Sequence, residues 1–494
     1  MRRLSRRSSL CMRSFNVKLS EFPFSGYTLT SYIWYMNNAF TMPSLRPIVS
    51  LFLLLLMLTP AVAQQKAIVA GPMTGSVELR DAIIWLEVAP TVKNAAVRYY
   101  KNGQPGSSRT ETYTGELGKR YNPIKIQLVN LEPGTTYQYE IVLNGQKASL
   151  PRALHFTTKP LWQYRQPAPD FSFLTGSCAY FNEPAYDRPG VPYGHDSSIF
   201  ETMAATPANF MMWLGDNWYT RDVDYASIPG LEYRAHRDRS LPVLQPFLQA
   251  MPHYAIWDDH DFGPNNANKS YIFRDASREV FTRYWANPSF GEKGEGIYTR
   301  MSYSDVDFFL LDGRYWSSAG EMADSIGGQP NPAKKMYGDA QMEWLRNALL
   351  QSNASFKIIV TGSQALNPIS IFDSFHHFPI EYHSFMNFLR EYKIPGVLFL
   401  TGDRHHSEVV KLPREGAYPL YDITSSPLTS GVGGVLRGNE KDNPYRVPGT
   451  LVVTQNFSKV TVSGEKGDRK LKVVFIDKNR KELATFEVGQ KELR

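Results

Sequence analysis

The feature that most constrains the fold of this chain is an apolar run, residues 210–214, that is followed at once by polar side chains. These side chains are Asp216, Asn217 and Tyr219. A continuous apolar run of this length is typical of a strand that is buried on both faces of a parallel sheet. In open α/β sheets, ligands bind outside the carboxyl ends of the strands. The run therefore predicts a sheet edge at which polar side chains gather.

Three other apolar runs end in the same way. Residues 171–175 precede Cys178, residues 254–257 precede Asp258, Asp259 and His260, and residues 397–400 precede Asp403 and His405. These residues offer sulfur, oxygen and nitrogen donors of the kinds that metal ions use in proteins. We therefore expect the donors to converge on one sheet edge.

The chain has 494 residues, which is long enough for two domains and a sizeable core. Alternating runs broken by Gly, Pro and Asn predict a small all-β sandwich over residues 64–158, with a fibronectin-type tyrosine corner near Tyr137. Residues 159–169 are rich in Pro and Gln and predict a linker. From residue 170 to residue 494, strands alternate with helical patterns, which predicts a largely parallel α/β sheet.

An amino-terminal leader is expected before the sandwich. Residues 48–58 form an apolar run that is too short to span a bilayer, follows Arg46 and precedes a small-residue segment ending at Ala63. This pattern predicts a secretory signal cleaved after Ala63, and an uncleaved anchor is the alternative. Because Met42 begins a better signal than Met1, we interpret the residues before Met42 as an upstream extension from a misplaced start.

The leader also changes the interpretation of charge. The whole chain contains 54 Lys/Arg and 47 Asp/Glu residues, and residues 1–63 contain seven of the Lys/Arg and one of the acidic residues. Without this segment the numbers of basic and acidic residues are almost equal, so the mature protein is nearly neutral. It has no polybasic run, and we predict neither a nucleic-acid-binding patch nor a membrane span in it. Of the two cysteines, Cys11 lies in the leader, which leaves Cys178 without a disulfide partner. Cys178 is either a small buried residue or a metal thiolate, and its place beside the other donors favours the thiolate.

Five ordered motifs give the chain a resemblance to a known family. The motifs are Gly176-Ser177-Cys178, Leu214-Gly215-Asp216 with Tyr219, Trp257-Asp258-Asp259-His260-Asp261 followed by Asn265, Leu311-Asp312-Gly313-Arg314, and Gly402-Asp403-Arg404-His405. With them the chain resembles PhoD-like alkaline phosphatases, a branch of the calcineurin-like metallophosphoesterases related to purple acid phosphatases. The resemblance covers most of the mature chain. It implies an α/β fold, a four-layer α/β/β/α sandwich preceded by a fibronectin/Ig-like β-sandwich.

The residue chemistry points by itself to metal-assisted hydrolysis of a phosphate ester. Two adjacent cations can neutralise the phosphate, generate hydroxide near neutral pH and stabilise the leaving oxygen. Thiolate, phenolate and carboxylate donors suit ferric iron. Carboxylate and amide oxygens suit a less charged cation such as calcium or magnesium. The usual first Asp-x-His motif of the superfamily is absent, so the general pattern does not identify the metals.

The resemblance implies a role for each donor. Asp216 is the expected bridging ligand, with Cys178 and Tyr219 on the side of the iron (Fe³⁺), although Tyr219 is alternatively a core aromatic residue. Asp403 and His405 are two residues apart, so in an extended strand end their side chains would point the same way, as two ligands require. Asn265 is the expected amide ligand of the second cation, for which we expect calcium. Asp259 competes with Asn265 for this position.

Asp259 and three further residues are candidates for catalysis and substrate binding. His260 follows Asp259 as a histidine follows the metal-ligating asparagine in the wider superfamily, so we expect His260 to donate a proton to the leaving oxygen, unless it is a structural histidine. Asn217 and Arg314 are candidates for binding phosphate oxygens. An arginine after a strand often forms a salt bridge instead. The remaining histidines near the motifs, which are spare ligands or rim residues, are His376, His377, His383 and His406.

The sequence therefore predicts an exported metal-dependent phosphoesterase. It would hydrolyse phosphodiesters, phosphomonoesters or both with a metal-bound hydroxide and without a covalent phosphoenzyme. The alternative is a secreted binding protein whose phosphoesterase domain is catalytically degenerate. In either case we expect loops at 182–194, 320–337 and 425–445 to form the walls of the site.

Overall fold

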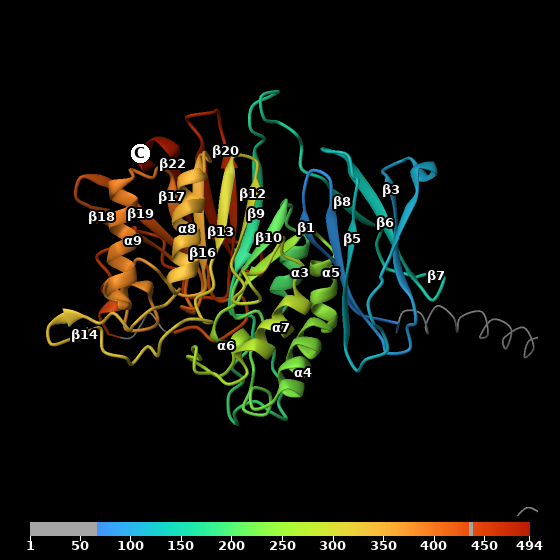
Figure 1. The fold of residues 1–494 in the computed structure, drawn as a ribbon, viewed down its shortest axis with the longest axis horizontal. Helices are drawn as coiled ribbons and strands as arrows, with labels where there is room; N and C mark the ends of the chain where they lie inside the picture. Colours follow the sequence, from blue (N-terminus) through green and yellow to red (C-terminus); the bar gives the residue numbers. More distant parts are fainter. Residues whose placement is uncertain (1–66, 434–437) are drawn as a thin grey trace, which may run out of the picture. The chain divides into compact units, whose positions relative to one another are not determined.

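A computed structural model describes residues 67–433 and 438–494 of the chain. The predicted leader at 1–63 lies outside the described residues. No helix in the described ranges is both long and apolar enough to cross a membrane. Figure 1 shows the course of the chain.

Residues 68–157 form two antiparallel sheets. The first has the order β1 (Ile68–Val77), β2 (Ala82–Val88), β5 (Asn122–Leu128). The second has the order β4 (Arg109–Thr112), β3 (Ala95–Lys101), β6 (Thr136–Leu143), β7 (Gln146–Lys147), and β8 (Leu154–Thr157) also pairs with β6. Side chains of β6 alternate between buried and half-buried, which is why this segment forms a strand with one face on a core. The Tyr137 hydroxyl accepts a hydrogen bond from the backbone N–H of Glu132 at 2.9 Å, as expected for a tyrosine that closes a turn.

The rest of the described chain contains two six-stranded mixed sheets. The order of the first is β11 (His253–Ile256), β10 (Phe210–Leu214), β9 (Phe171–Gly176), β20 (Phe457–Ser463), β21 (Lys470–Ile476), β22 (Glu482–Gly489). Strands β9, β10 and β11 are parallel, whereas β20, β21 and β22 are antiparallel. The alternating pattern of the sequence predicts a hairpin that pairs residues 459–462 with 471–476, and β20 and β21 form it, since Val462 faces Leu471. Its pairing with β9 was not predicted.

The second sheet has a parallel centre with antiparallel edges. Its order is β12 (Thr299–Tyr303), β13 (Val306–Leu310), β16 (Phe356–Thr361), β17 (Val397–Thr401), β19 (Ala417–Thr424), β18 (Glu408–Arg414). Strands β13, β16, β17 and β19 are parallel, and β12 and β18 are antiparallel to their neighbours. The prediction of one largely parallel sheet is therefore replaced by two mixed sheets. The small two-stranded sheet of β14 (Ser325–Ile326) and β15 (Gln329–Pro330) lies in the loop before the helix that follows β13.

The two large sheets pack face to face, because each has a central strand that is apolar on both faces. The rings of Phe173 from β9 and Phe308 from β13 are 5.3 Å apart and belong to one buried cluster. On the outer side of the second sheet, Phe309 and Phe399 pack in another cluster with Leu345 and Phe385, which come from α8 (Asp339–Gln351) and α9 (Pro379–Glu391). Figure 1 shows both helices along this sheet.

Helices on the other side cover the first sheet. The ring of Trp213 in β10 lies 6.1 Å from that of Phe200 in α3 (Ile199–Ala204) and 5.7 Å from that of Phe247 in α5 (Gln245–Leu248). The remaining helices are α4 (Ile228–Arg239), α6 (Asp259–Phe262) and α7 (Arg274–Tyr284). The amino-terminal strands pack against α7, where the Trp85 indole donates to the Arg283 carbonyl at 2.9 Å.

One predicted helix is displaced in the structure. The sequence pattern predicts a helix over 239–250, but α4 ends at Arg239, and a short 3₁₀ turn, Pro242–Leu244, and α5 follow it. Helix α4 escaped prediction because its first turn contains Pro229 and Gly230. Proline is tolerated at the start of a helix, and the Ser227 side chain accepts a hydrogen bond from the Gly230 N–H at 3.2 Å as the N-cap.

Candidate metal centre

The strand ends bring the predicted donors together at one side of the paired sheets. Trp213 pairs with Gly176 and Leu214 with Ile256, so β9, β10 and β11 end side by side. In the second sheet, Thr361, Thr401 and Thr424 lie in register at the ends of β16, β17 and β19. The expected convergence is therefore present, but on the neighbouring ends of two sheets.

Glycines allow the loops after these strands to approach closely. Gly215 has a φ of 91°, and a Cβ atom at this position would lie 2.7 Å from the Cβ atom of Asp258. A Cβ atom on Gly402 would lie 2.6 Å from the carbonyl oxygen of Leu214 and 2.8 Å from the side chain of Ser177. Any other residue would push the loops of the two sheets apart.

Four of the predicted metal ligands have left-handed backbone conformations. The φ angles are 62° at Cys178, 51° at Asp216, 65° at Asp403 and 54° at His405. Such angles are uncommon for residues with a Cβ atom, and they occur in tight turns as well as at functional sites. Asp403 and His405 are thus not in an extended strand end, as the alternation by two predicted, because β17 ends at Thr401. Their side chains reach the site from a sharply turned loop.

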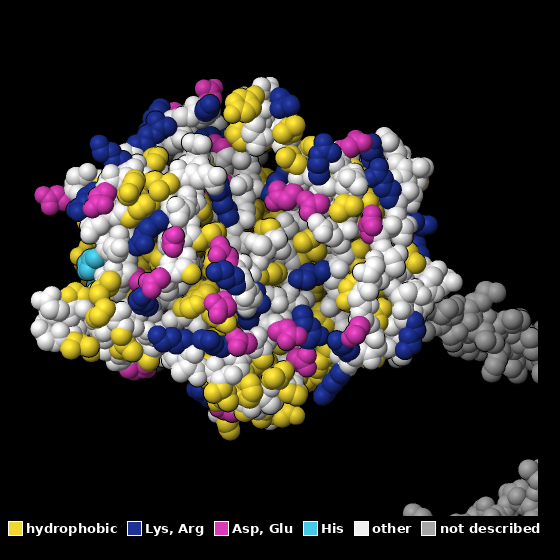
Figure 2. All heavy atoms as spheres, in the orientation of Figure 1, with side chains coloured by type: hydrophobic (Ala, Val, Ile, Leu, Met, Phe, Trp, Pro, Cys, Tyr) yellow, Lys and Arg dark blue, Asp and Glu magenta, His cyan; other side chains and the backbone are white. Residues whose placement is uncertain are grey.

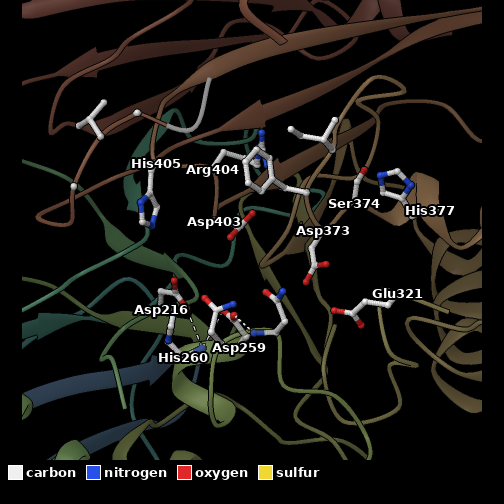
Figure 3. Close-up of a pocket in the computed structure, with 18 of the residues that line it drawn as sticks. Asp216, Asp259, His260, Glu321, Asp373, Ser374, His377, Asp403, Arg404 and His405 are labelled. Atoms are coloured by element: carbon white, nitrogen blue, oxygen red, sulfur yellow. Dashed lines mark hydrogen bonds between the residues drawn. The ribbon is translucent and has the colours of Figure 1, made fainter. Parts of the chain in front are cut away.

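Two groups of donors have a geometry that could hold a cation. Donor atoms of Cys178, Asp216 and His405 all lie within 4.8 Å of one another, and so do those of Asp216, Asp259 and His260. Asp216 belongs to both groups. Figure 3 shows Asp216, Asp259 and His260 facing Asp403 and His405 across a cavity. This is the arrangement that a bridging carboxylate between two cations requires.

Tyr219 lies beside the first group. Its hydroxyl is 3.3 Å from Nε2 of His405 and 3.4 Å from Oγ of Ser430, and its side chain is buried. The ring lies against that of His260, with 4.2 Å between their centroids. The phenol is therefore close to a predicted ligand, and it also contributes to packing.

The structure brings both candidates for the second site to the cavity. Asn265 lines the cavity, and within the described ranges its side chain makes no hydrogen bond. The Asp259 carboxylate accepts hydrogen bonds from the backbone N–H of Asn266 at 2.6 Å and of His260 at 3.0 Å. Asp259 is also one of the residues grouped around Asp216. Both residues are thus available, and the competition between them predicted from the sequence stays open.

The electrostatics of the site fit a bound cation. Burial, followed by the charges of Asp259 and Asp258, raises the pKa of Asp216 well above its usual range. Burial also raises the pKa of Asp403 to about 7, and burial together with Asp216 raises the pKa of the Cys178 thiol. Buried acids without compensating charge are costly. Cations at this place would offset that cost and hold the acids ionised, so the donor set suits metal ions.

His260, the predicted proton donor, lies at the cavity. Burial lowers its pKa, although Asp259 acts in the opposite direction. Its Nδ1 atom is buried without a hydrogen-bond partner among the described residues, whereas the structural histidine His253 bonds through both ring nitrogens. His376 and His406 also have a ring nitrogen without a hydrogen-bond partner, but of these three histidines His260 alone lines the cavity in the described part of the chain.

Arg314 and Asn217 are held by other residues. The Arg314 guanidinium contacts Asp258 at 2.5 Å, Asp373 at 2.8 Å and Ser363 at 3.1 Å. The Asn217 side chain donates to the carbonyl oxygen of Ile256 at 2.8 Å. Neither residue is among those that line the cavity in the described part of the chain. In this structure Arg314 forms the salt bridges that were the alternative for it.

The four other candidate histidines differ in their surroundings. His406 is fully buried, with Nδ1 2.9 Å from the Arg404 carbonyl oxygen and Nε2 3.3 Å from Glu408, so it belongs to a structural network. His377 lines the cavity, and its Nε2 lies 2.8 Å from the carbonyl oxygen of Ser370. His376 and His383 do not line the cavity within the described residues.

The cavity has a volume of about 1100 Å³ and is walled by the three predicted loops. Sequence reasoning missed several residues that line it, namely Glu321, Asp373, Ser374 and Arg404. The signal for Arg404 was its place next to Asp403, whereas Glu321 and Asp373 lie in loops with no motif. It also missed Tyr193, whose hydroxyl is 2.9 Å from Nδ1 of His405.

Two mixed sheets with donor-bearing strand ends define a metallophosphoesterase-like α/β protein, and two solved structures share this fold. One, described as the structure of PhoD, aligns with a TM-score of 0.67 and 18% identity over 87% of this chain and 91% of that chain. The other is the purple acid phosphatase PPD1 from yellow lupin (Lupinus luteus) seeds. It aligns with a TM-score of 0.59 and 10% identity over 85% of this chain and 74% of that chain.

The chain belongs to the PhoD-like phosphatase family, whose model matches residues 173–456. A second model, a domain of unknown function (DUF7800), matches residues 65–160. Alkaline phosphatase D of Bacillus subtilis (strain 168) is 22% identical over 380 residues, which are 65% of this chain and 61% of that protein. The chain thus matches less than two thirds of the length of this curated relative.

Proposed function

We propose that the protein is a metal-dependent phosphoesterase that hydrolyses phosphodiesters, phosphomonoesters or both. The observation that carries the proposal is the sharing of Asp216 between two donor groups in a cavity wide enough for a substrate. Paired cations about 4 Å apart clamp the attacking and leaving oxygens in phosphoryl transfer. No observation in the described part of the chain favours the alternative of a degenerate binding protein.

The donors suggest which cations the residues would hold. Cys178, Tyr219 and His405, with Asp216, would hold ferric iron, and Asp216 with Asp259 or Asn265 would hold a divalent cation, for which we propose calcium. Asp403 faces both groups and is available to either. When bound, the cations would neutralise the phosphate and supply a hydroxide from water.

The remaining residues would act on the substrate and on its surroundings. His260 would donate a proton to the leaving oxygen, because its unpartnered Nδ1 atom is buried beside the cavity. Asn217 would orient the loop around Asp216, since its backbone N–H donates to Asp261 at 2.9 Å. Direct phosphate binding by Asn217 or Arg314 stays a prediction.

The proposal is tested with purified protein and a matched pair of model substrates, one monoester and one diester. We expect hydrolysis that requires added metal and falls at least about 10³-fold in Asp216→Ala and in Asp403→Ala. A Tyr164→Ala variant, altered at a fully exposed residue outside the cavity, is the control. Activity that survives both aspartate substitutions would refute the proposal.

The domain organisation and export belong to the same proposal. We propose a fibronectin/Ig-like sandwich over 64–158, a linker over 159–169 and a four-layer catalytic domain over 170–494. The two face-to-face sheets with helices outside support the last part. Export after cleavage at Ala63 is tested by amino-terminal sequencing of the protein recovered outside the cytoplasm, where a mature chain that starts at Gln64 is expected.

A further inference from the structure

A second cavity adjoins the candidate metal centre. It has a volume of about 540 Å³, and we call it the tyrosine pocket. Its walls include Tyr180, Tyr186, Tyr193, Tyr219, Tyr225 and Arg188. Tyr193, His260 and Asn265 line both cavities, so the tyrosine pocket opens beside the residues that would act on the phosphate. A volume of this size suits a small organic group.

Two rings of the tyrosine pocket are open to a ligand. Tyr186 is 49% exposed and Tyr193 is 43% exposed. Among the described residues, the Tyr186 side chain makes no hydrogen bond and stacks on no other ring. Figure 2 shows hydrophobic side chains gathered at the lower end of the molecule, where Figure 1 draws the loops below α4. An unused aromatic face beside a reaction site is a ready stacking surface.

The walls of the pocket are held in place before any ligand binds. The Arg221 guanidinium stacks on Tyr180 at 4.2 Å, pairs with Asp187 at 3.0 Å and donates to the Phe181 carbonyl at 2.7 Å. The buried Arg234 forms ion pairs at 2.8 Å with both Glu183 and Asp224. These contacts hold the chain on both sides of Tyr186, at Glu183 and at Asp187. A preformed pocket loses little conformational entropy when a ligand binds.

The charge of the pocket also fits the proposed substrate. The Arg188 side chain is exposed, and in the described ranges it forms no ion pair or hydrogen bond. A guanidinium can stack on a planar ring or pair with a phosphate oxygen. The pocket therefore offers stacking faces and the exposed Arg188 guanidinium, while the acidic residue Asp222 in its wall is bonded to the Tyr225 hydroxyl.

We propose that the tyrosine pocket binds a planar aromatic group, a nucleoside base or a simple aryl ring, on the alcohol half of the phosphate ester. The ring stacks on Tyr186 and Tyr193 while the phosphate occupies the candidate metal centre. The inference rests on the proposed function and narrows its substrate class. Stacking of a base on an aromatic side chain changes affinity by about 5- to 150-fold.

The test separates binding from turnover. Calorimetry with the metal-loaded protein compares adenosine 5′-monophosphate with ribose 5-phosphate, which lacks the base. A second pair, methyl benzyl phosphate and methyl cyclohexylmethyl phosphate, presents an aryl ring or a saturated ring on alcohols of similar basicity. Each pair is measured with wild type, Tyr186→Ala, Tyr186→Phe and the exposed control Tyr164→Ala.

We expect the wild type to prefer the aromatic member of at least one pair by at least about fivefold. Tyr186→Ala should lose this preference, Tyr186→Phe should keep it because the ring remains, and Tyr164→Ala should not change it. A preference within the first pair identifies a nucleoside, and one confined to the second pair identifies a simple aryl alcohol. Equal affinities within both pairs, or a preference that persists in Tyr186→Ala, would overturn the inference. Absence of hydrolysis with the preference intact would instead count against the proposed function.

Discussion

At the scale of single residues, the site is a set of acids that the fold buries without enough positive charge. Asp216 and Asp403 have raised pKa values because of burial, and Cys178 lies between them, with its sulfur 3.7 Å from the Asp216 carboxylate. The left-handed backbone at all three residues adds strain of about 1–3 kcal/mol each. Bound cations would offset these costs, so we interpret the strain as part of the function.

Tyr219 gives the first prediction at this scale. If its phenolate binds ferric iron, the purified protein should absorb visible light by charge transfer from the tyrosinate, and Tyr219→Phe should remove that band. Tyr180→Phe is the matched control, because Tyr180 lies next to Tyr219 but its hydroxyl donates to Asp187 at 2.8 Å. The measurement is an absorption spectrum alongside the iron content. A protein that keeps its iron and its colour in Tyr219→Phe would exclude this role.

Arg314 gives the second prediction. Since its guanidinium pairs with the buried Asp258, Arg314→Met should lower the free energy of unfolding by about 3–5 kcal/mol, as expected when one partner of a buried ion pair is lost. Arg283→Met, which breaks the partly exposed pair with Glu232, should cost about 1 kcal/mol or less through the lost pair. Urea unfolding measures both. A stable Arg314→Met protein with only a raised KM would instead support direct phosphate binding.

At the scale of elements, the strands were predictable and their partners were not. The run that forms β10 is apolar throughout and ends at a glycine, so the strand and its polar end followed from local pattern alone. The pairing of β20 with β9 joins residues almost 300 positions apart, as in Val462 with Phe171, and no local signal encodes it. Helix α4 was missed because Pro229 and Gly230 are helix-compatible only in a capped first turn.

The same limits of local sequence pattern explain which parts of the candidate metal centre could be predicted. Four candidate donors, Cys178, Asp216, Asp403 and His405, could be predicted because each follows a strand end in a motif. The partners of Arg314 and the bond from Tyr193 to His405 depend on loop conformations, which the sequence pattern does not determine. The extended backbone predicted for the Asp403–His405 pair was wrong, because a turn replaces it, although both side chains line the cavity.

Gly215 provides a prediction at the scale of elements. Gly215→Ala should cost about 1–3 kcal/mol more than Gly103→Ala. Both glycines have positive φ angles, 91° and 74°, but a Cβ atom at 215 meets Asp258 at 2.7 Å, whereas one at 103 meets nothing within 4 Å. The comparison therefore isolates the crowding between the β10 and β11 loops from the backbone strain that both variants share. If urea unfolding shows that both variants lose the same free energy of unfolding, the β10 and β11 loops are not tightly packed at Gly215.

At the scale of the whole molecule, one network links the second sheet to the long loop before β20. Glu408, buried in β18, lies 2.6 Å from Arg446, 2.9 Å from Gln364 and 3.3 Å from His406. Burial opposes ionisation, but the hydrogen bond and charge of His406, together with Arg446 and Gln364, lower the pKa of Glu408 to about 2. The loop behind the candidate ligands is thus held by a charged group.

This network predicts an acid-sensitive component of stability. Because the pKa of Glu408 is lower in the folded protein than its value of about 4.3 in an unfolded chain, the network stabilises the protein fully above pH ~4.3. The stabilisation is lost as the pH falls from about 4.3 towards 2. In Glu408→Gln this part of the pH dependence should disappear. Urea unfolding of both proteins between pH 6 and pH 3 checks it, and parallel curves would contradict it.

The most direct test of the central claim is the metal content of single-ligand variants. If Asp216 bridges two cations, the wild type should bind two metal ions per chain, Cys178→Ser should lose one of them, Asp259→Asn should lose or weaken the other, and Asp216→Ala should lose both. Elemental analysis after dialysis against metal-free buffer measures this. An Asp216→Ala protein that folds and retains both ions would contradict the account.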